Sequence, residues 1–435
     1  MTVSPFGSII YQELFSDQEI SFIFSDQEHI RSMIAVEMAL AHVQGELNII
    51  PKKIAQQITN HLKNVKIEAK DLSQGTTKDG VVVPTLVKLL QKEMGDDKAS
   101  YLHYGVTSQD ILDTALVLQS AKVIEIYEKR IDSLIKNLSA LAHNHRATIM
   151  AARTRSQIST PTSFGLKAAN WLMPFKRHKQ RLQQLKQRFL ILSFGGASGT
   201  LSALSPKDAK ATAQGLAEKL GLTLPPAPWH SQRDNIGEIG SFCTLLTGSM
   251  AKMASDIIFL CASGINELSI IGGGTSSTMP QKNNPALAET IVALARSNIN
   301  LCTSLQIHNQ ERDGAAWQLE WITLPNILNN TGACLKHTIN LIDALIINDD
   351  VMTSNIKNTH GTLLAEAASF LLSQYMSRPE AQKIVAKACQ TAVTTKIHLF
   401  DILENETKHD IDWQDQKELK KHIGLNDQFI NDIIQ

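Results

Sequence analysis

The sequence lacks the features of several large protein classes. Lysine plus arginine equals aspartate plus glutamate, at 42 each, so the formal net charge is zero. Proteins that bind nucleic acids usually carry an excess of positive charge, and none is present here. No apolar run reaches the roughly 18 uncharged residues that a membrane helix requires. These absences predict a protein that binds neither nucleic acid nor a membrane.

Cysteine is also scarce and dispersed. The five cysteines are odd in number and form no Cys-x-x-Cys motif; they are Cys243, Cys261, Cys302, Cys334 and Cys389. This pattern is typical of buried thiols in a reducing compartment. The first residues, Met1–Phe15, have neither a basic start nor a long apolar stretch, so we expect no secretion signal. The sequence therefore predicts a cytoplasmic protein.

Helical periodicity dominates the middle of the chain. Besides the helix that contains residues 124–141, long helices are expected over about 162–192, about 235–268, from Pro285 onward and over about 325–347. We find no convincing period-two alternation, so the predicted fold class is all-α. The clearest apolar stripe recurs at alternating steps of three and four; its members are Ile124, Tyr127, Ile131, Leu134, Leu138 and Leu141.

The length of 435 residues exceeds that of one ordinary core. We expect an N-terminal helical domain over 1–112, a central bundle of long helices over 113–350 and a C-terminal helical domain over 351–435. Five helices of roughly 25–30 residues exceed what a compact domain usually contains. Such helices suggest burial against other subunits through stripes such as 124–141. A monomeric long bundle is the alternative.

Four segments rich in glycine, serine and threonine interrupt the helices, at 73–80, 103–110, 193–205 and 271–285. Small residues let backbone amides and hydroxyls approach a ligand. In the last segment, a helix beginning at Pro285 would direct its free N–H groups at the preceding loop, favouring a carboxylate and lowering the pKa of a nearby serine. A plain linker before a helix is more common, and the residues alone leave both interpretations open.

The segment 275–285 resembles the signature Gly-Ser-Ser-x-Met-Pro-x-Lys-x-Asn-Pro of the fumarase/aspartase superfamily, with Thr275 at the glycine position. The resemblance implies that Ser276, the first serine of the pair, is the catalytic base. It also implies that Lys282 and Asn284 contact a substrate carboxylate.

Four further blocks occur in the order of that superfamily, at 103–110, 153–157, 229–234 and 310–313. The first is similar to His-x-Gly-x-Thr-Ser-x-Asp, whose two hydroxyls hold a carboxylate, and the second lies where the superfamily has Arg-Thr-x-x-Gln. Together with the signature, the resemblance implies that the substrate-binding residues are His103, Thr107, Ser108, Arg153, Gln157, Gln232, Lys282, Asn284 and Arg312.

The resemblance also implies the assembly. It predicts a three-domain all-α fold whose long five-helix bundle assembles into the twenty-helix core of a homotetramer. Each site would then be built from blocks of three subunits, which explains why the blocks are scattered along the chain.

The chemistry follows from the kinds of side chain in these blocks. Removing a proton beside a carboxylate creates a dianionic, enolate-like intermediate, which preorganised cations and hydrogen-bond donors stabilise. A free serine is a very weak base, so Ser276 would act as a locally stabilised alkoxide or through a proton relay. No metal and no cofactor are expected. The predicted ligand is a small di- or tricarboxylate.

Within the superfamily, the chain resembles the bacterial 3-carboxy-cis,cis-muconate cycloisomerases of aromatic degradation more than the adenylosuccinate lyases. Leu14 and Phe15 stand at the Arg-Tyr pair that grips the nucleotide phosphate in those lyases. Arg155 stands at their general-acid histidine, and 314–316 replaces their Ser-x-Ser. Arg155 is unusual for both families, so a related tricarboxylate lyase stays open. A catalytically silent helical scaffold is a further alternative.

Overall fold

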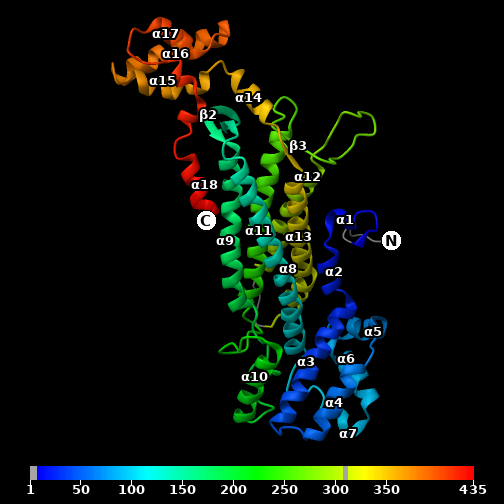
Figure 1. The fold of residues 1–435 in the computed structure, drawn as a ribbon. Helices are drawn as coiled ribbons and strands as arrows, with labels where there is room; N and C mark the ends of the chain where they lie inside the picture. The colour runs from blue at the N-terminus through cyan, green and yellow to red at the C-terminus, as the bar shows by residue number, and fades with distance from the viewer. Residues whose placement is uncertain (1–6, 307–311) are drawn as a thin grey trace. The chain divides into compact units, whose positions relative to one another are not determined.

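The computed structural model describes residues 7–306 and 312–435, most of them in helices (Figure 1). The all-α prediction is confirmed. Five long helices are α8 (Ser108–Asn144), α9 (Phe164–Phe189), α11 (Asp234–Cys261), α12 (Ala286–Leu305) and α13 (Gly314–Asp343).

Other helices precede, interrupt and follow these five. Before α8 lie α1 (Gln12–Phe15), α2 (Gln18–Ile23), α3 (Asp26–Glu46), α4 (Lys52–Asn64), α5 (Ala69–Asp79), α6 (Val83–Met94) and α7 (Asp96–Ala99). Helix α10 (Pro206–Leu220) separates α9 from α11. After α13 follow α14 (Asp349–Lys357), α15 (Ala365–Leu372), α16 (Arg378–Thr395), α17 (Leu399–Glu406) and α18 (Asn426–Ile434).

The chain packs as two compact units. The first consists of residues 1–130, 178–248 and 293–336, and the second of 131–177, 249–292 and 337–435. All five long helices contribute residues to both units. The three-domain division at 112 and 350 stays a prediction.

The core of the first unit lies where α3, α4, α5 and α6 pack on the first turns of α8. Met33, Leu86, Leu90 and Ile111 are fully buried there. Helix α3 begins after Ser25, whose hydroxyl accepts the backbone N–H of Glu28 and so caps the helix. This packing fixes the position at which α8 begins, and with it the residues of the 103–110 block.

The apolar stripe of α8 is buried within the chain itself. Ile124 is 1% exposed, and Tyr127, Ile131, Leu134 and Leu138 are 0% exposed. The hydroxyl of Tyr127 donates to the carbonyl of Leu328 on α13. The prediction that other subunits bury this stripe is therefore wrong, because the neighbouring helices of the same chain already cover it.

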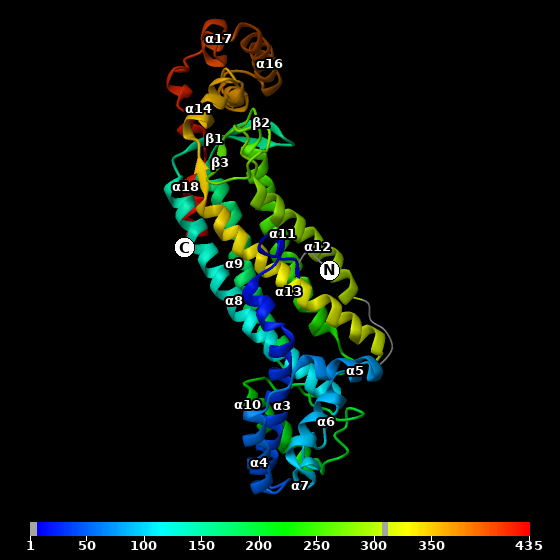
Figure 2. The same cartoon turned by 90° about the vertical axis from the view of Figure 1, so that its right-hand side faces the viewer.

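Two antiparallel sheets of two strands each belong to the second unit, and the search for period-two alternation missed both. Strand β1 (Ile149–Thr154) pairs with β2 (Gln157–Ser163), and β3 (Leu268–Ile270) pairs with β4 (Leu345–Ile347) (Figure 2). Three-residue strands are too short to show a period, and a bulge between Ala151 and Arg153 breaks the alternation in β1. Ala151 itself is buried against the core formed by α15, α16 and α17.

Several predicted helix limits need correction. Helix α13 begins at Gly314, so Pro325 lies inside it, where proline removes one hydrogen bond without ending the helix. Helix α11 ends at Cys261, and the later residues of the predicted range enter β3. The predicted interruption at 73–80 belongs mostly to α5, because glycine and threonine are tolerated in a packed helix.

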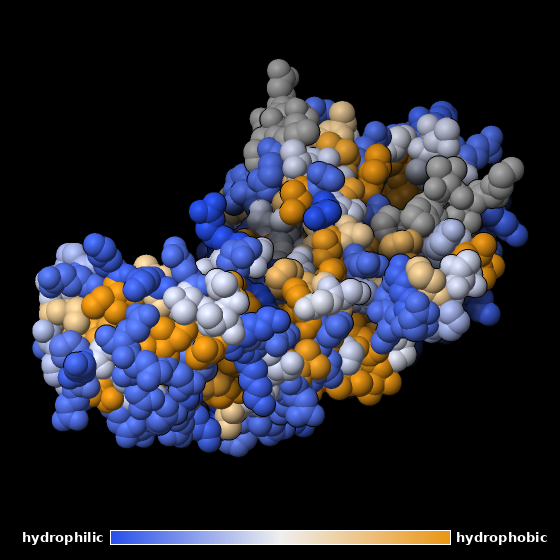
Figure 3. Space-filling model, turned by 90° about the horizontal axis from the view of Figure 1, so that it is seen from above, coloured by the Kyte–Doolittle hydropathy of each residue, from blue (hydrophilic) through white to orange (hydrophobic). Residues whose placement is uncertain are grey.

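Some apolar side chains of the long helices are exposed in the single chain, and the surface of one face is mixed (Figure 3). Leu245 on α11 is 55% exposed, Ile299 on α12 53% and Ile322 on α13 66%. Among the described residues, α11 alone is long and apolar enough to cross a membrane, and 44% of its apolar window is buried inside the chain. A core helix of a soluble protein passes the same test.

Candidate active site

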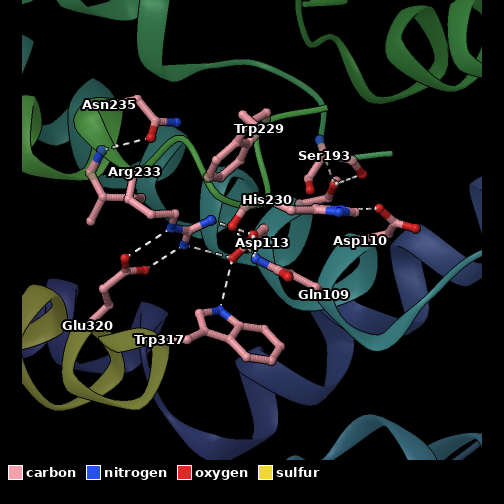
Figure 4. A network of polar contacts seen from close by, with 12 residues as sticks. Gln109, Asp110, Asp113, Ser193, Trp229, His230, Arg233, Asn235, Trp317 and Glu320 are labelled. Carbon is pink, nitrogen blue, oxygen red and sulfur yellow. Dashed lines mark hydrogen bonds and ion pairs between the residues drawn. The ribbon is translucent and has the colours of Figure 1, made fainter. Parts of the chain in front are cut away.

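The start of α8 is organised around a buried carboxylate, Asp110, which is 1% exposed (Figure 4). Asp110 accepts the backbone N–H groups of Thr107 at 3.0 Å, Gly195 at 2.7 Å and Gly196 at 2.9 Å. Its Oδ1 also lies 2.7 Å from Nε2 of His230. Since Thr107 directly precedes α8, its bond to Asp110 caps the helix. This one carboxylate fixes both the helix start and the 195–196 loop.

Arg312 reaches the same helix end. Its Nε donates to Oε1 of Gln109 at 3.1 Å, and its Nη1 donates to the carbonyl of Ala197. The half-buried hydroxyls of Thr107 and Ser108 lie at the N-terminal end of α8, where free N–H groups and the positive end of the helix dipole favour an anion. The structure therefore brings three predicted residues, Thr107, Ser108 and Arg312, to one anion-favouring place.

A buried ion triad lies next to this helix end. Arg233 donates to Asp113 at 2.6 and 3.1 Å and to Glu320 at 2.9 Å (Figure 4). Its guanidinium also stacks over Trp229, 4.7 Å from the ring centroid. Burial alone would lower the pKa of Arg233, but the charge of Asp113 and the hydrogen bond to Glu320 outweigh burial and raise it. The triad joins α8, α13 and the 229–235 segment, and so holds the exposed Gln232 in place.

His103 is paired with a buried glutamate. Its Nδ1 lies 2.5 Å from Oε1 of Glu37, which is 1% exposed on α3. Burial lowers the pKa of His103, but the hydrogen bond and charge of Glu37, aided by Asp110, raise it above 6.5 overall. His103 also has a φ of 60°, a strained value for a non-glycine residue. The pairing favours a charged imidazole near the N-terminal end of α8.

The signature loop belongs to the second unit and is closed at its base. Gly274 and Asn284 exchange two backbone hydrogen bonds of 2.8 Å, and the side chain of Asn283 donates to the carbonyl of Ile270 at 2.8 Å. Helix α12 then begins at Ala286, one residue after the predicted start at Pro285. Thr275 is not among the residues with positive φ, so a β-branched residue replaces the signature glycine without that strain.

Ser276 accepts two hydrogen bonds from backbone amides of its own loop. Its Oγ accepts the backbone N–H groups of Thr278 at 3.3 Å and Met279 at 3.1 Å. Two amide donors stabilise negative charge on this oxygen, and hydrogen bonds to the charged form of a group lower its pKa. Lys282 is exposed on the same loop and supplies a cation.

Arg153 and Gln157 lie on the β1–β2 hairpin, also in the second unit. Both terminal nitrogens of Arg153 donate to Glu267, at 2.7 and 2.6 Å, and Glu267 is fully buried. The guanidinium is thus occupied by a carboxylate of the chain itself, directly before β3 and the signature loop. Gln157 is exposed at the end of the hairpin.

The predicted residues therefore form two groups. His103, Thr107, Ser108, Gln232 and Arg312 belong to the first unit, whereas Arg153, Gln157, Ser276, Lys282 and Asn284 belong to the second. Gln310 and Glu311 of the fourth block lie outside the described residues.

Sequence reasoning missed the carboxylates that hold these side chains. Asp110 is the last residue of the first block, so its regular spacing from Thr107 was a usable signal. Glu37 and Glu267 follow no motif, and nothing in the sequence connects them with His103 and Arg153.

Comparison with known proteins gives the family. Residues 10–298 match the model of the lyase family. The chain belongs to this family. The chain is 34% identical to 3-carboxy-cis,cis-muconate cycloisomerase of Acinetobacter baylyi over 91% of its own length and 90% of that protein. It is also 34% identical to trans-aconitate decarboxylase 1 of Mycosarcoma maydis, over 97% of its own length and 88% of that protein.

Solved structures of related enzymes have the same fold as this chain. The 3-carboxy-cis,cis-muconate lactonizing enzyme from Pseudomonas putida superposes with a TM-score of 0.91 at 31% identity, covering 98% of each chain. The fumarase/aspartase fold that the motifs implied is thus confirmed over nearly the whole chain. The protein is therefore an enzyme of the fumarase/aspartase superfamily.

Proposed function

We propose that the protein is a cycloisomerase that interconverts 3-carboxy-cis,cis-muconate and 4-carboxymuconolactone, with Ser276 as its base. The observation that carries the proposal is the pair of amide hydrogen bonds to the Ser276 hydroxyl. Serine is otherwise too weak a base, and two backbone donors favour its alkoxide. This environment supports proton transfer to and from a carbon beside a carboxylate.

The reaction balances with one proton. In the direction of lactone formation, a carboxylate oxygen bonds to a carbon of the more distant double bond. The electrons of that double bond move onto the neighbouring carbon and its carboxylate, giving a dianionic enolate. The Ser276 hydroxyl then delivers a proton to that carbon. In the reverse direction the Ser276 alkoxide removes this proton and the carbon–oxygen bond of the ring breaks.

The leaving group explains why no general acid is needed opposite Ser276. Ring opening releases a carboxylate, which is stable as an anion, with an ordinary pKa near 4. An amine leaving group, as in adenylosuccinate cleavage, would require a proton donor. Arg155 stands where the adenylosuccinate lyases have that donor, and an arginine does not lose its proton. The substitution at this position fits a carboxylate leaving group.

One cavity beside the N-terminal helices of the first unit bears on the adenylosuccinate alternative. A cavity of about 530 Å³ opens between α2, α3, α5, α8 and α13. Its charged lining residues are Asp26, Asp113 and Glu320, and no described lysine or arginine lines it. Asp113 and Glu320 are already paired with Arg233. Without a described lysine or arginine on its lining, this cavity does not favour the adenylosuccinate alternative.

A decarboxylase acting on a related tricarboxylate is the second candidate. It is favoured by the equal identity of 34% to the Mycosarcoma maydis protein and by Arg155, which departs from the cycloisomerase pattern. Both candidates require the same recognition of several carboxylates. They differ in whether carbon dioxide is released.

One assay separates these functions. The purified protein is incubated with 3-carboxy-cis,cis-muconate, trans-aconitate and adenylosuccinate in parallel, with absorbance and carbon dioxide both recorded. Loss of the conjugated diene without carbon dioxide is the expected result. Release of carbon dioxide from trans-aconitate, or turnover of adenylosuccinate alone, would replace the cycloisomerase proposal.

We also propose that the protein is a cytoplasmic homotetramer. The exposed Leu245, Ile299 and Ile322 support this, because they lie on α11, α12 and α13, three of the helices that would form the core of the tetramer. The described cysteines are all free thiols, as expected in a reducing compartment. Light scattering of the active enzyme tests the assembly, and an active species with the 47.9 kDa mass of one chain would exclude the tetramer.

A further inference from the structure

The cations of the motif blocks differ in whether the chain already neutralises them. Arg153 is paired with Glu267, and His103 with Glu37. Arg312 donates to an amide and a carbonyl oxygen, neither of which carries a full charge. Among the residues that the structure describes, Lys282 and Arg155 have no carboxylate partner. Three motif cations are therefore available to carboxylates of a ligand.

Arg155 occupies an unfavourable backbone position. The pairing of Thr154 with Gln157 leaves Arg155 and Ser156 as a two-residue turn between β1 and β2. Their φ values are 48° and 65°, and positive φ at both central residues defines the turn type for which Asn-Gly is the preferred sequence. Neither residue is glycine, asparagine or aspartate. Strain of this kind persists where a side chain is needed for a function other than folding.

Hydrogen bonds and buried side chains fix the strand that precedes the turn. Glu267 accepts both terminal nitrogens of Arg153 and also the side-chain amide of Asn355 at 2.9 Å. At the other end of β1, Met150 and Ala151 are buried. The strand is thus fixed up to the residue before the turn, whereas Arg155 itself is exposed. Its guanidinium projects from a rigid support with no charge partner in the described chain.

We propose that Arg155 determines substrate specificity by binding the third carboxylate of a tricarboxylate. The inference rests on the proposed function, whose substrate, 3-carboxy-cis,cis-muconate, carries three carboxylates. Guanidinium and carboxylate form two parallel hydrogen bonds, so arginine distinguishes a substrate with the third carboxylate from one without it. Arg153 is a positioning residue, whose pairing with Glu267 fixes the turn that carries Arg155.

Kinetics with matched substrates test this role. Arg155→Gln should lower kcat/KM for 3-carboxy-cis,cis-muconate by about 10- to 100-fold, the scale of one charged hydrogen-bonding partner. The value for cis,cis-muconate, which lacks the third carboxylate, should change little. Arg155→Lys should retain part of the preference because the charge remains. Lys387→Gln, which removes an exposed cation of α16, is the matched control. An equal fall for both substrates, or none, would overturn the assignment.

A binding measurement separates this inference from the proposed activity. Thermal-shift titrations compare tricarballylate, a saturated tricarboxylate, with glutarate, a dicarboxylate. Wild type should bind tricarballylate more tightly, and Arg155→Gln should lose that preference. If wild type does not turn over carboxymuconate but shows this result, the cycloisomerase proposal fails and the role of Arg155 stands. If Arg155→Gln keeps the preference, the role of Arg155 fails whatever the reaction is.

A turn-optimised variant excludes a purely structural role. Arg155→Asn combined with Ser156→Gly installs the sequence that the backbone prefers, so the melting temperature should rise or stay unchanged. Selectivity for the tricarboxylate should nevertheless be lost. A stable variant that retains wild-type selectivity would show that Arg155 does not contact the substrate.

Discussion

At the start of α8, Asp110 accepts three backbone amides and pairs with His230, all within a buried network. The signature loop of the second unit differs, because Ser276 is held only by amides of its own loop and Lys282 is exposed. We therefore expect substitutions in the first group to lower mainly stability, and substitutions in the loop to lower mainly turnover.

The largest expected effect concerns the loop. Ser276→Ala should lower kcat by roughly 10²–10⁴-fold, the usual contribution of a general base, with little change in substrate affinity. Steady-state kinetics and ligand titration measure the two quantities. Ser277→Ala, on the same loop, is the control and should be milder. Near-normal turnover by Ser276→Ala would move the role of base to another residue.

The next effect should appear in the first unit as a loss of stability. Arg233→Met leaves Asp113 and Glu320 as buried carboxylates without their cation, which should lower the free energy of unfolding by about 3–5 kcal/mol. Denaturant unfolding measures it. Arg188→Met removes the exposed pair with Glu238 and should change stability little. Equal effects of the two substitutions would contradict the distinction between a buried support and a surface pair.

A glycine substitution in the signature loop should instead lower activity and change stability little. In Gly273→Ala the new Cβ would lie 1.8 Å from Oδ1 of Asn283, whose side chain anchors the loop to Ile270. We expect kcat/KM to fall about tenfold, since a displacement of about 1 Å is costly in catalysis, with a small change in unfolding. In the control, Gly248→Ala on α11, the new Cβ would have no heavy atom of another part of the chain within 4 Å. A large loss of stability in Gly273→Ala would show that the loop supports the fold.

The smallest effect is the pH dependence of stability from His103. Its pKa in the folded protein is raised above 6.5, so its ionisation stabilises the fold fully below that value. This contribution is lost as pH rises through the raised pKa. Glu37→Gln removes the main cause and should flatten the decline, by about 1.4 kcal/mol per unit of pKa shift removed. Unfolding is measured from below to above pH 6.5. Glu93→Gln, beside His61 at 3.9 Å, should leave the profile unchanged.

The residue types and their order carried much of the site. The segment 275–285 predicted roles for Ser276, Lys282 and Asn284 because its amino acids follow a signature whose chemistry depends on side-chain type. The long helices were also predictable, since an apolar period extends over many turns. Strands of three residues were not, because their pairing depends on partners far along the chain, as between Leu268 and Ile347.

The sequence by itself determined the family, the helical class and the list of chemical groups, because these depend on local pattern and order. Only the tertiary structure decided which of the charged groups are left without a partner in the described chain and can therefore bind a ligand. It neutralised Arg153 with Glu267, a partner 114 residues away, and left Arg155 exposed on a strained turn. It also covered the stripe of α8 within one chain, which the period alone had suggested was an interface. A pattern tells which face is apolar, but what covers that face depends on packing between segments distant in sequence.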